Sequence, residues 1–318
     1  MQITANPYAS EEAKELLNYL SDMAGKKIIT GQHTQTNEME EVSYIRDNTG
    51  KTPKLIGFEL LSYSPNINYD DATAACLKEI EDNKNTLDTA MDLAKNSDVI
   101  LTMTFHWYSP IGGRDKSFYT ENTDFDAEKV LCDSTPERIA FFHDMDIIAK
   151  ELKKFSDENI PILWRPFHES EGQWFWWAAK GPEIACELYK LMFEYYTYHH
   201  QLNNLLWVWN CPLANGYPGD AYVDIISMDI YLSEYAKTDY SKEYEKLISE
   251  TTKSKVAALA EVGYIPDIQM LERSHTPWAY YMTWSKEFCI GEQYNKTDNL
   301  RAMYKSEYAI MSRMDILA

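Results

Sequence analysis

The sequence predicts an α/β protein of the (β/α)8 class, the TIM barrel. Eight short apolar segments alternate with longer segments of helical periodicity, which is the order of elements in such a barrel. Most of the apolar segments are continuous rather than alternating, as expected of parallel strands that are covered on both faces. The 318 residues also exceed the roughly 250 of a typical barrel, which leaves room for long loops.

The expected strands and helices follow one another along the whole chain. The strands are predicted at residues 27–31, 54–59, 98–106, 161–168, 205–209, 223–231, 256–261 and 279–284. The helices are predicted at residues 11–24, 73–96, 135–157, 181–201, 241–252 and 298–316. Ser134 or Thr135, ahead of Pro136, is a typical helix start. Residues 210–222 are too short and too rich in Pro, Gly and Asn for a helix, so one connection departs from the alternation.

The chain is expected to form a single domain over residues 1–318. Its hydrophobic content of 45% is sufficient for a core, and no linker, repeat or low-complexity stretch divides it. A doubly wound open sheet is the alternative fold. No GxGxxG-like phosphate loop follows any predicted strand, so the barrel is favoured.

The charge balance limits the partners of the chain. A formal net charge of −20, from 50 acidic and 30 basic residues, argues against nucleic acid or an anionic membrane as a partner. No transmembrane run or signal peptide stands in the sequence, and we expect a secreted or cell-surface monomer whose leader is absent, with a cytoplasmic location as the alternative. The five cysteines show no CxxC spacing, which disfavours a zinc site and a disulfide framework.

The segment from residue 161 to residue 177 is the most informative part of the chain. An apolar run ends in Arg165, His168 and Glu169, and Trp174-Phe-Trp-Trp177 follows closely. Ionisable groups at the end of a buried strand are costly unless they serve a function. Indoles are the usual surface on which the apolar faces of sugar rings stack. The combination indicates carbohydrate chemistry.

A second carboxyl group completes a candidate catalytic pair. Glu169 and Glu261 each end an apolar run, and by the strand count they follow strands four and seven at the barrel mouth, where TIM-barrel active sites lie. Glycosidic bonds are cleaved by two such carboxyl groups, one a general acid and the other a nucleophile or base. The alternatives are an ion pair between Glu169 and Arg165, and a strand that runs from Glu261 into a glycine turn.

Metal-dependent hydrolysis is not expected from this sequence. A zinc-binding helix would need a histidine four residues after His168, where Gly172 stands, and Pro166 disfavours a helix. The sequence therefore predicts no metal site and no cofactor. The histidines treated as structural or exposed are His33, His143, His199, His200 and His275.

The strand-end residues resemble those of glycoside hydrolase family 26, whose members are mostly endo-β-1,4-mannanases. The most specific match is Trp164-Arg-Pro-Phe-His-Glu169 with Trp174-Phe-Trp-Trp177. Further matches, which cover essentially the full length, are Gly31-Gln-His33, Gly57-Phe-Glu59, Tyr63-Ser-Pro65, Phe105-His-Trp107, Trp207-Val-Trp209, Met228-Asp-Ile-Tyr231, Ala260-Glu-Val-Gly263 and Met282-Thr-Trp284. Glu59 stands where the family commonly has Asp, and Ser170-Glu171 where Met-Asn is frequent. These departures concern the subsites rather than the catalytic pair.

The resemblance implies Glu169 as acid/base and Glu261 as nucleophile of a retaining double displacement. It also implies a cleft bordered by residues 108–132. We expect burial and the charge of Glu261 to keep Glu169 protonated. The residues expected to bind substrate are His106, Trp107, Arg165, His168, Trp174, Tyr231 and Trp284.

The implied activity is endo-hydrolysis of β-1,4-mannan. Three alternatives keep the fold and the mechanism: a mixed-linkage β-glucanase, a β-1,3-xylanase and an exo-acting mannobiohydrolase. A more distant alternative is a barrel that binds sugar without hydrolysing it.

Overall fold

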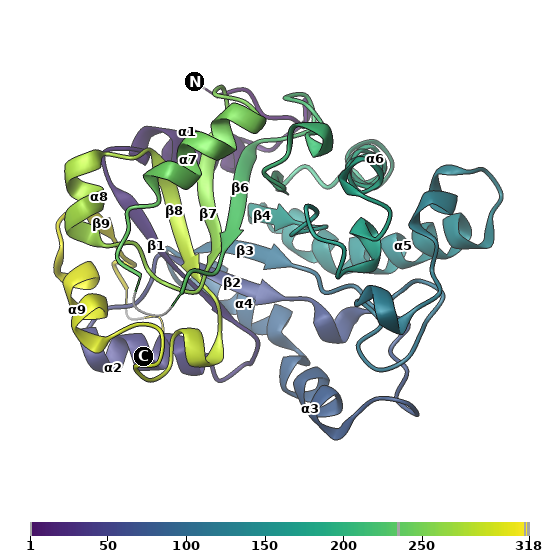
Figure 1. Cartoon of the computed structure of the whole chain (residues 1–318), viewed down its shortest axis with the longest axis horizontal. Helices are drawn as coiled ribbons and strands as arrows, with labels where there is room; N and C mark the ends of the chain where they lie inside the picture. Colours follow the sequence, from purple (N-terminus) through teal and green to yellow (C-terminus); the bar gives the residue numbers. More distant parts are fainter. Residues whose placement is uncertain (1, 234–235, 315, 317–318) are drawn as a thin grey trace.

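The computed structural model describes residues 2–233, 236–314 and 316, and these form a parallel β-barrel surrounded by helices (Figure 1). Strands β2 to β8 pair in sequence order, β8 pairs with β1, and β1 pairs with β2 to close the barrel. The barrel strands are β1 (Ile28–Thr34), β2 (Leu55–Glu59), β3 (Ile100–Thr104), β4 (Ile162–Arg165), β5 (Leu205–Asn210), β6 (Ile225–Ile230), β7 (Val256–Val262) and β8 (Trp278–Thr283). The predicted (β/α)8 TIM barrel is confirmed, and every predicted strand segment contains a strand.

The helices lie between the strands along the chain. They are α1 (Glu11–Met23), α2 (Glu40–Thr49), α3 (Ala74–Asn83), α4 (Thr86–Asn96), α5 (Pro136–Asp157), α6 (Pro182–Glu194), α7 (Ser241–Glu250), α8 (Ile268–Ser274) and α9 (Thr297–Lys305). The predicted start of α5 is confirmed, since the Thr135 side chain accepts from the N–H of Arg138 and Pro136 opens the first turn. Residues 210–222 contain only a short 3-10 turn, as expected.

Three helix predictions need correction. The segment predicted as one helix over residues 73–96 is two, because Asn85 adopts a left-handed backbone (φ 63°) between α3 and α4. The helix predicted over residues 298–316 ends at Lys305, and strand β9 (Ala309–Ile310) follows and pairs with β1. Helices α2 and α8 were not predicted, since one is largely polar and the other has only 7 residues.

Two apolar clusters make up the core. The inner cluster fills the barrel with strand residues such as Leu163, Leu206 and Met282, and it includes Leu17 and Leu20 of α1. Because α1 packs against both β5 and β8, it crosses the end of the barrel where the strands begin. The larger outer cluster lies between the strands and the surrounding helices. The opposite end of the barrel, where the strands finish, remains available for a site.

All five cysteines are free thiols, and four of them are buried. Among the described residues, no helix combines the length and the apolar character that crossing a membrane requires.

Candidate active site

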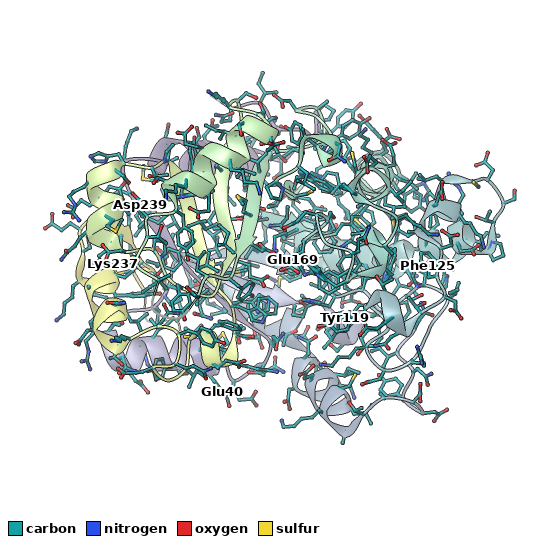
Figure 2. All side chains as sticks on the ribbon, in the orientation of Figure 1. Glu40, Tyr119, Phe125, Glu169, Lys237 and Asp239 are labelled. Carbon is teal, nitrogen blue, oxygen red and sulfur yellow. The ribbon has the colours of Figure 1, made fainter. Side chains whose placement is uncertain are left out.

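Three carboxyl groups meet at the end of the barrel where the strands finish. Glu169 follows β4, Asp229 lies near the end of β6, and Glu261 lies near the end of β7. One oxygen from each lies within 4.8 Å of the others. Figure 2 shows Glu169 near the centre of the molecule, beside the ends of the strands. The barrel therefore brings together the two carboxyl groups that the sequence singled out.

The backbone turns sharply after β4 to place Glu169. Both Phe167 (φ 52°) and Glu169 (φ 54°) adopt the left-handed conformation, which costs a non-glycine residue on the order of 1–3 kcal/mol. Asn210, at the end of β5, holds this turn, because its Oδ1 accepts from the N–H of Glu169 at 2.7 Å. The amide nitrogen of Asn210 donates to Asp229 at 2.7 Å and to Ser227 at 3.0 Å. Asn210 thus couples the position of Glu169 to β6.

An exposed tryptophan holds the carboxyl group of Glu169 from the open side. The Nε1 of Trp174 donates to Oε2 of Glu169 at 2.7 Å, and the Trp174 side chain is 45% exposed. The indole lies over Gly172, where a Cβ atom would be only 2.1 Å from the ring. Glycine at that position therefore makes room for an indole that both binds Glu169 and presents a face to solvent.

Two donors fix the carboxylate of Glu261. Nη2 of Arg165 lies 2.7 Å from Oε2 of Glu261, and the hydroxyl of Tyr231 donates to Oε1. The ring of Tyr231 is itself exposed at the barrel mouth. With both oxygens engaged, the orientation of Glu261 is determined by its neighbours.

Arg165 lies beneath the carboxyl groups rather than in the open cleft. Its side chain is 0% exposed, forms ion pairs with Asp229 and Glu261, and donates to Thr104 at 3.2 Å. Burial alone would lower the pKa of Arg165, but the charges of Asp229 and Glu261 raise it, so the guanidinium stays charged. The alternative drawn from the sequence was an ion pair between Arg165 and Glu169, whereas Arg165 pairs with Asp229 and Glu261. These ion pairs give Arg165 a positioning role in place of the expected contact with substrate.

Removing the Arg165 guanidinium is expected to destabilise the fold strongly. Arg165→Met would leave two carboxylates buried without their cation, which typically costs about 3–5 kcal/mol. Urea unfolding would measure the loss. The matched control is Lys153→Met, which removes an ion pair with Asp157 at the protein surface, where side-chain exposures are 47% and 63%. Equal stability of the two variants would contradict the role assigned to Arg165.

The environment of Glu169 raises its pKa to about 7. Burial is the largest cause, and the charges of Glu261 and Glu171 add to it, while the hydrogen bond from Trp174 and the charge of Arg165 oppose it. This agrees with the expectation that burial and Glu261 hold a proton on Glu169. One carboxyl group of the pair is thereby suited to donate a proton near neutral pH.

Two histidines lie in contact beside the pair, and their pKa values shift in opposite directions. Nδ1 of His106 lies 2.8 Å from Glu59, whose other oxygen accepts from the His106 N–H at 2.8 Å. Burial alone would lower the pKa of His106, but Glu59 raises it above the ordinary value. The ring of His168 is 4.6 Å from that of His106, and burial, then His106 and Arg165, lower its pKa well below the ordinary value. His168 is therefore neutral.

A hollow of about 250 Å³ adjoins His106 at the barrel mouth. Trp284 forms part of its wall, and the Trp284 ring stacks on the buried ring of His33 with centroids 4.0 Å apart. Residues of the segment after β3 complete the wall, as expected for the loop over residues 108–132. Lining residues that bear on recognition are Glu59, His106, Phe118, Tyr119, Trp284 and Phe288. The hollow thus combines aromatic faces with polar groups.

Trp107 lies away from this hollow, contrary to its predicted place. It is 2% exposed, its Nε1 donates to Asp144 of α5 at 2.8 Å, and its ring stacks on Phe141 of the same helix. Consecutive residues of an extended chain point in opposite directions, so His106 faces the mouth while Trp107 faces the helix layer. Trp176 and Trp177 are also fully buried, which leaves Trp174 as the exposed member of that cluster.

Four residues of the site were not among the predicted site residues: His33, Glu59, Asn210 and Asp229. His33 and Glu59 stand in the strand-end motifs of the sequence, and Asn210 directly follows the strand predicted at residues 205–209. A signal for Asp229 was its place two residues before Tyr231, since residues two apart face the same side of a strand. Their shared role is to hold the side chains that face the cleft.

Comparison with known proteins identifies the family. The family model described as glycosyl hydrolase family 26 matches residues 5–313. The chain belongs to this family. Among similar relatives, a mannan endo-1,4-beta-mannosidase from Thermothelomyces thermophilus is 34% identical over 313 residues, which is 96% of this chain and 61% of that protein. The chain spans only about half of a similar relative from Piromyces sp, 51% of its length at 30% identity.

Solved structures share the same fold. The Podospora anserina GH26-CBM35 β-(1,4)-mannanase superposes with a TM-score of 0.85 at 35% identity, covering 98% of this chain and 68% of that one. A β-mannanase from a symbiotic protist of the termite Reticulitermes speratus, complexed with a gluco-manno-oligosaccharide, also gives a TM-score of 0.85, at 28% identity. That match covers 97% of this chain and 96% of the other.

Proposed function

We propose that this chain is a retaining endo-β-1,4-mannanase in which Glu169 and Glu261 act on opposite sides of one glycosidic bond. The observation that carries the proposal is that one carboxyl oxygen of Glu169 and one of Glu261 lie within 4.8 Å of each other. Retaining glycosidases hold the two groups about 5–5.5 Å apart, whereas inverting enzymes need about 6.5–9.5 Å to admit a water molecule. The observed spacing supports retention.

In the first step, Glu261 attacks the anomeric carbon while Glu169 protonates the departing oxygen, and a glycosyl ester forms on Glu261. Esterification removes the negative charge of Glu261, which is one cause of the high pKa of Glu169. The pKa of Glu169 then falls, so the same group can take a proton from the water that cleaves the ester. Arg165 and Tyr231 keep the nucleophile in position throughout.

Sugar binding is assigned to side chains at the barrel mouth and to His168, which is 1% exposed and lies against His106. Trp174 and Trp284 offer ring faces on which a pyranose can stack, and Tyr231 is exposed beside the nucleophile. His106 and neutral His168 supply nitrogen atoms that can bond to hydroxyl groups. This set retains the predicted binding residues except Trp107, whose ring is in the helix layer, and Arg165, which acts through Glu261.

Mannan is proposed as the substrate on the strength of the relatives. Those from T. thermophilus and Piromyces are mannan endo-1,4-beta-mannosidases, and the termite-symbiont structure holds a gluco-manno-oligosaccharide. We further propose that residues 1–318 act as one catalytic domain and as a monomer. Because mannan is a polymer found outside cells, we propose a secreted or cell-surface location for the protein. The carboxyl pair performs both proton transfer and nucleophilic attack, so the proposed reaction needs no cofactor.

A time course of products from linear mannan and mannohexaose tests the activity. A mixture of oligosaccharide lengths from the earliest points is the expected result for endo action. Disaccharide alone, released from chain ends, would instead indicate a mannobiohydrolase. Faster hydrolysis of lichenan or β-1,3-xylan would reassign the substrate, and calorimetric binding of mannan without any products would contradict the enzymatic proposal.

The pKa of Glu169 predicts the alkaline side of the pH–activity profile. Since Glu169 must be protonated to act and its pKa is about 7, kcat/KM should fall as pH rises through about 7. Trp174→Phe removes a hydrogen bond that lowers this pKa, so the fall should move to higher pH. Initial rates measured across a pH series give the pH at which activity falls in the unmodified protein and in Trp174→Phe.

Tyr8→Phe is the matched control for this shift, because Tyr8 is an exposed aromatic residue ahead of α1, at the other end of the barrel. Its pH profile should coincide with that of the unmodified protein. A Trp174→Phe profile that is lower in height but unmoved in pH would show that the hydrogen bond does not tune Glu169.

A further inference from the structure

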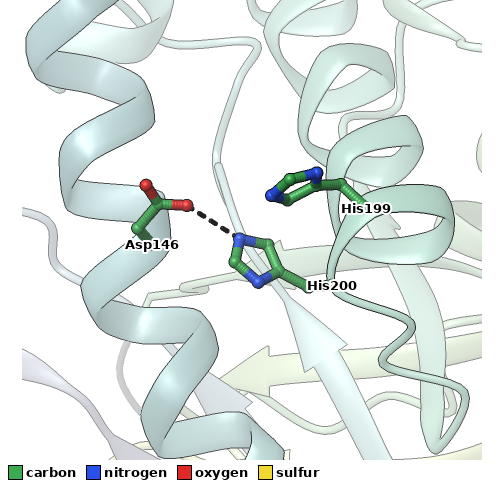
Figure 3. Close-up of side chains that lie close together, drawn as sticks. All are labelled: Asp146, His199 and His200. Carbon is green, nitrogen blue, oxygen red and sulfur yellow. Dashed lines mark hydrogen bonds and ion pairs between the residues drawn. The ribbon is translucent and has the colours of Figure 1, made fainter.

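A second cluster of ionisable side chains lies outside the barrel, between α5 and the end of α6 (Figure 3). It consists of Asp146 on α5 with His199 and His200, which follow α6. One carboxylate oxygen and one nitrogen from each ring all lie within 4.8 Å of one another. The proposed mechanism makes no use of this group. Two imidazoles and a carboxylate from separate helices form a common donor set for a metal ion.

The backbone at the end of α6 brings both histidines to the same place. Helix α6 continues into a π-helical turn over Tyr195–His199. Such turns are rare in proteins overall, and those that occur often lie at functional sites. The wider turn changes the direction in which its side chains point. Here the turn directs the rings of His199 and His200 toward α5, as Figure 3 shows.

Tyr195 supports the donor atoms from behind. Its hydroxyl donates to Oδ1 of Asp146 at 2.7 Å, and its ring lies parallel to that of His199 with centroids 4.6 Å apart and an interplanar angle of 5°. The Tyr195 ring also packs edge-on against Phe142 of α5 at 4.7 Å. Partners that orient metal ligands in this way raise affinity. One side chain therefore holds two of the three candidate ligands.

We propose that Asp146, His199 and His200 bind a divalent transition-metal ion such as Zn²⁺. Ligand atoms ~2.0–2.2 Å from a tetrahedral zinc lie about 3.4 Å apart, so the present cluster needs only a modest closure. His199 is exposed, and its stacking on Tyr195 keeps its ring beside the other two ligands. Nε2 of His200 now lies 2.9 Å from Oδ1 of Asp146, and this contact would open to admit the ion. The sequence-based expectation of no metal site is revised by this proposal.

The donor set and the location define what the ion would do. Imidazole nitrogens favour zinc, nickel or copper over calcium and magnesium, which prefer oxygen ligands. The cluster lies at the outer helix layer, and α6 runs from Pro182 toward it. The ion would join α5 to the end of α6 and stabilise the folded state by mass action. It would take no part in glycoside cleavage.

Zinc titration of the whole chain after removal of metal by a chelator tests the site. Isothermal titration calorimetry should show one zinc ion bound per chain with micromolar or tighter affinity, and thermal unfolding should shift to higher temperature with zinc. Asp146→Asn and His199→Ala should each weaken binding at least tenfold, as loss of a ligand requires. Calcium and magnesium should leave the melting temperature unchanged.

The matched control is His143→Ala, which removes another exposed histidine of α5 that lies outside the cluster. This variant should bind zinc like the unmodified protein. Melting temperatures of the metal-free variants show whether each is folded before zinc is added. Absence of saturable binding at millimolar zinc, or binding that survives in Asp146→Asn and His199→Ala, would overturn the proposal. Because calorimetry uses no polysaccharide, this result is independent of the proposed mannanase activity.

Discussion

Replacing Glu261 with glutamine is expected to abolish hydrolysis of every substrate, whatever its leaving group. An amide cannot form the glycosyl ester, so the double displacement has no first step. Loss of a catalytic nucleophile lowers kcat on the order of 10⁴- to 10⁶-fold in well-studied enzymes. Glutamine is nearly isosteric and can still bond to Arg165 and Tyr231, so the fold should be retained. Rates on mannan and on an activated aryl mannoside measure the effect.

Glu171→Gln is the control for this variant. Glu171 is a partly buried glutamate two residues after Glu169, and it raises the pKa of Glu169 only as a minor contributor. Its replacement should leave most of the activity in place. If Glu261→Gln hydrolysed mannan at a normal rate, or if Glu171→Gln lost as much activity, Glu261 would not be the nucleophile.

Replacing Glu169 with alanine is expected to impair poor leaving groups far more than good ones. Proton transfer by a positioned acid contributes about 10²- to 10⁴-fold, and mannan, whose leaving group is a sugar hydroxyl, depends on it fully. An activated aryl mannoside needs little protonation, so its first step should persist while hydrolysis of the ester slows. Steady-state rates on both substrates reveal the difference.

Added azide distinguishes this role from general disruption of the site. Azide needs no base, so it should enter the space left in Glu169→Ala, attack the ester and release a β-mannosyl azide. Glu169→Gln leaves no such space and should show little rescue. Equal losses on both substrates in Glu169→Ala, with no azide product, would contradict the role of acid/base.

The barrel could be predicted because its strands are encoded by continuous apolar runs. The segment that became β5 illustrates this, since Leu205–Trp209 is apolar throughout and buried on both faces. Short or polar helices lack such a signal. Helix α2 begins after Met39 in a left-handed conformation without a side-chain cap, and neither feature is visible as periodicity.

The meeting of Glu169 and Glu261 could be predicted because each carboxyl group ends a buried apolar run, where an ionisable group is costly unless it serves a function. The supports of the pair were harder to predict, because they depend on which strands are neighbours. Arg165 was predicted to bind substrate, with an ion pair to Glu169 as the alternative, but the barrel places it against Asp229 and Glu261. The cluster of Asp146 with His199 and His200 likewise arises from the packing of α5 against the end of α6. A local sequence pattern cannot predict such packing.

The configuration of the first sugar released tests the central claim most directly. If Glu261 forms a covalent intermediate and Glu169 serves both steps, NMR of mannohexaose hydrolysis should show the β-anomer of the new reducing end first, with the α-anomer appearing later by mutarotation. Early appearance of the α-anomer would mean inversion by a single displacement, and it would contradict the roles assigned to the two glutamates.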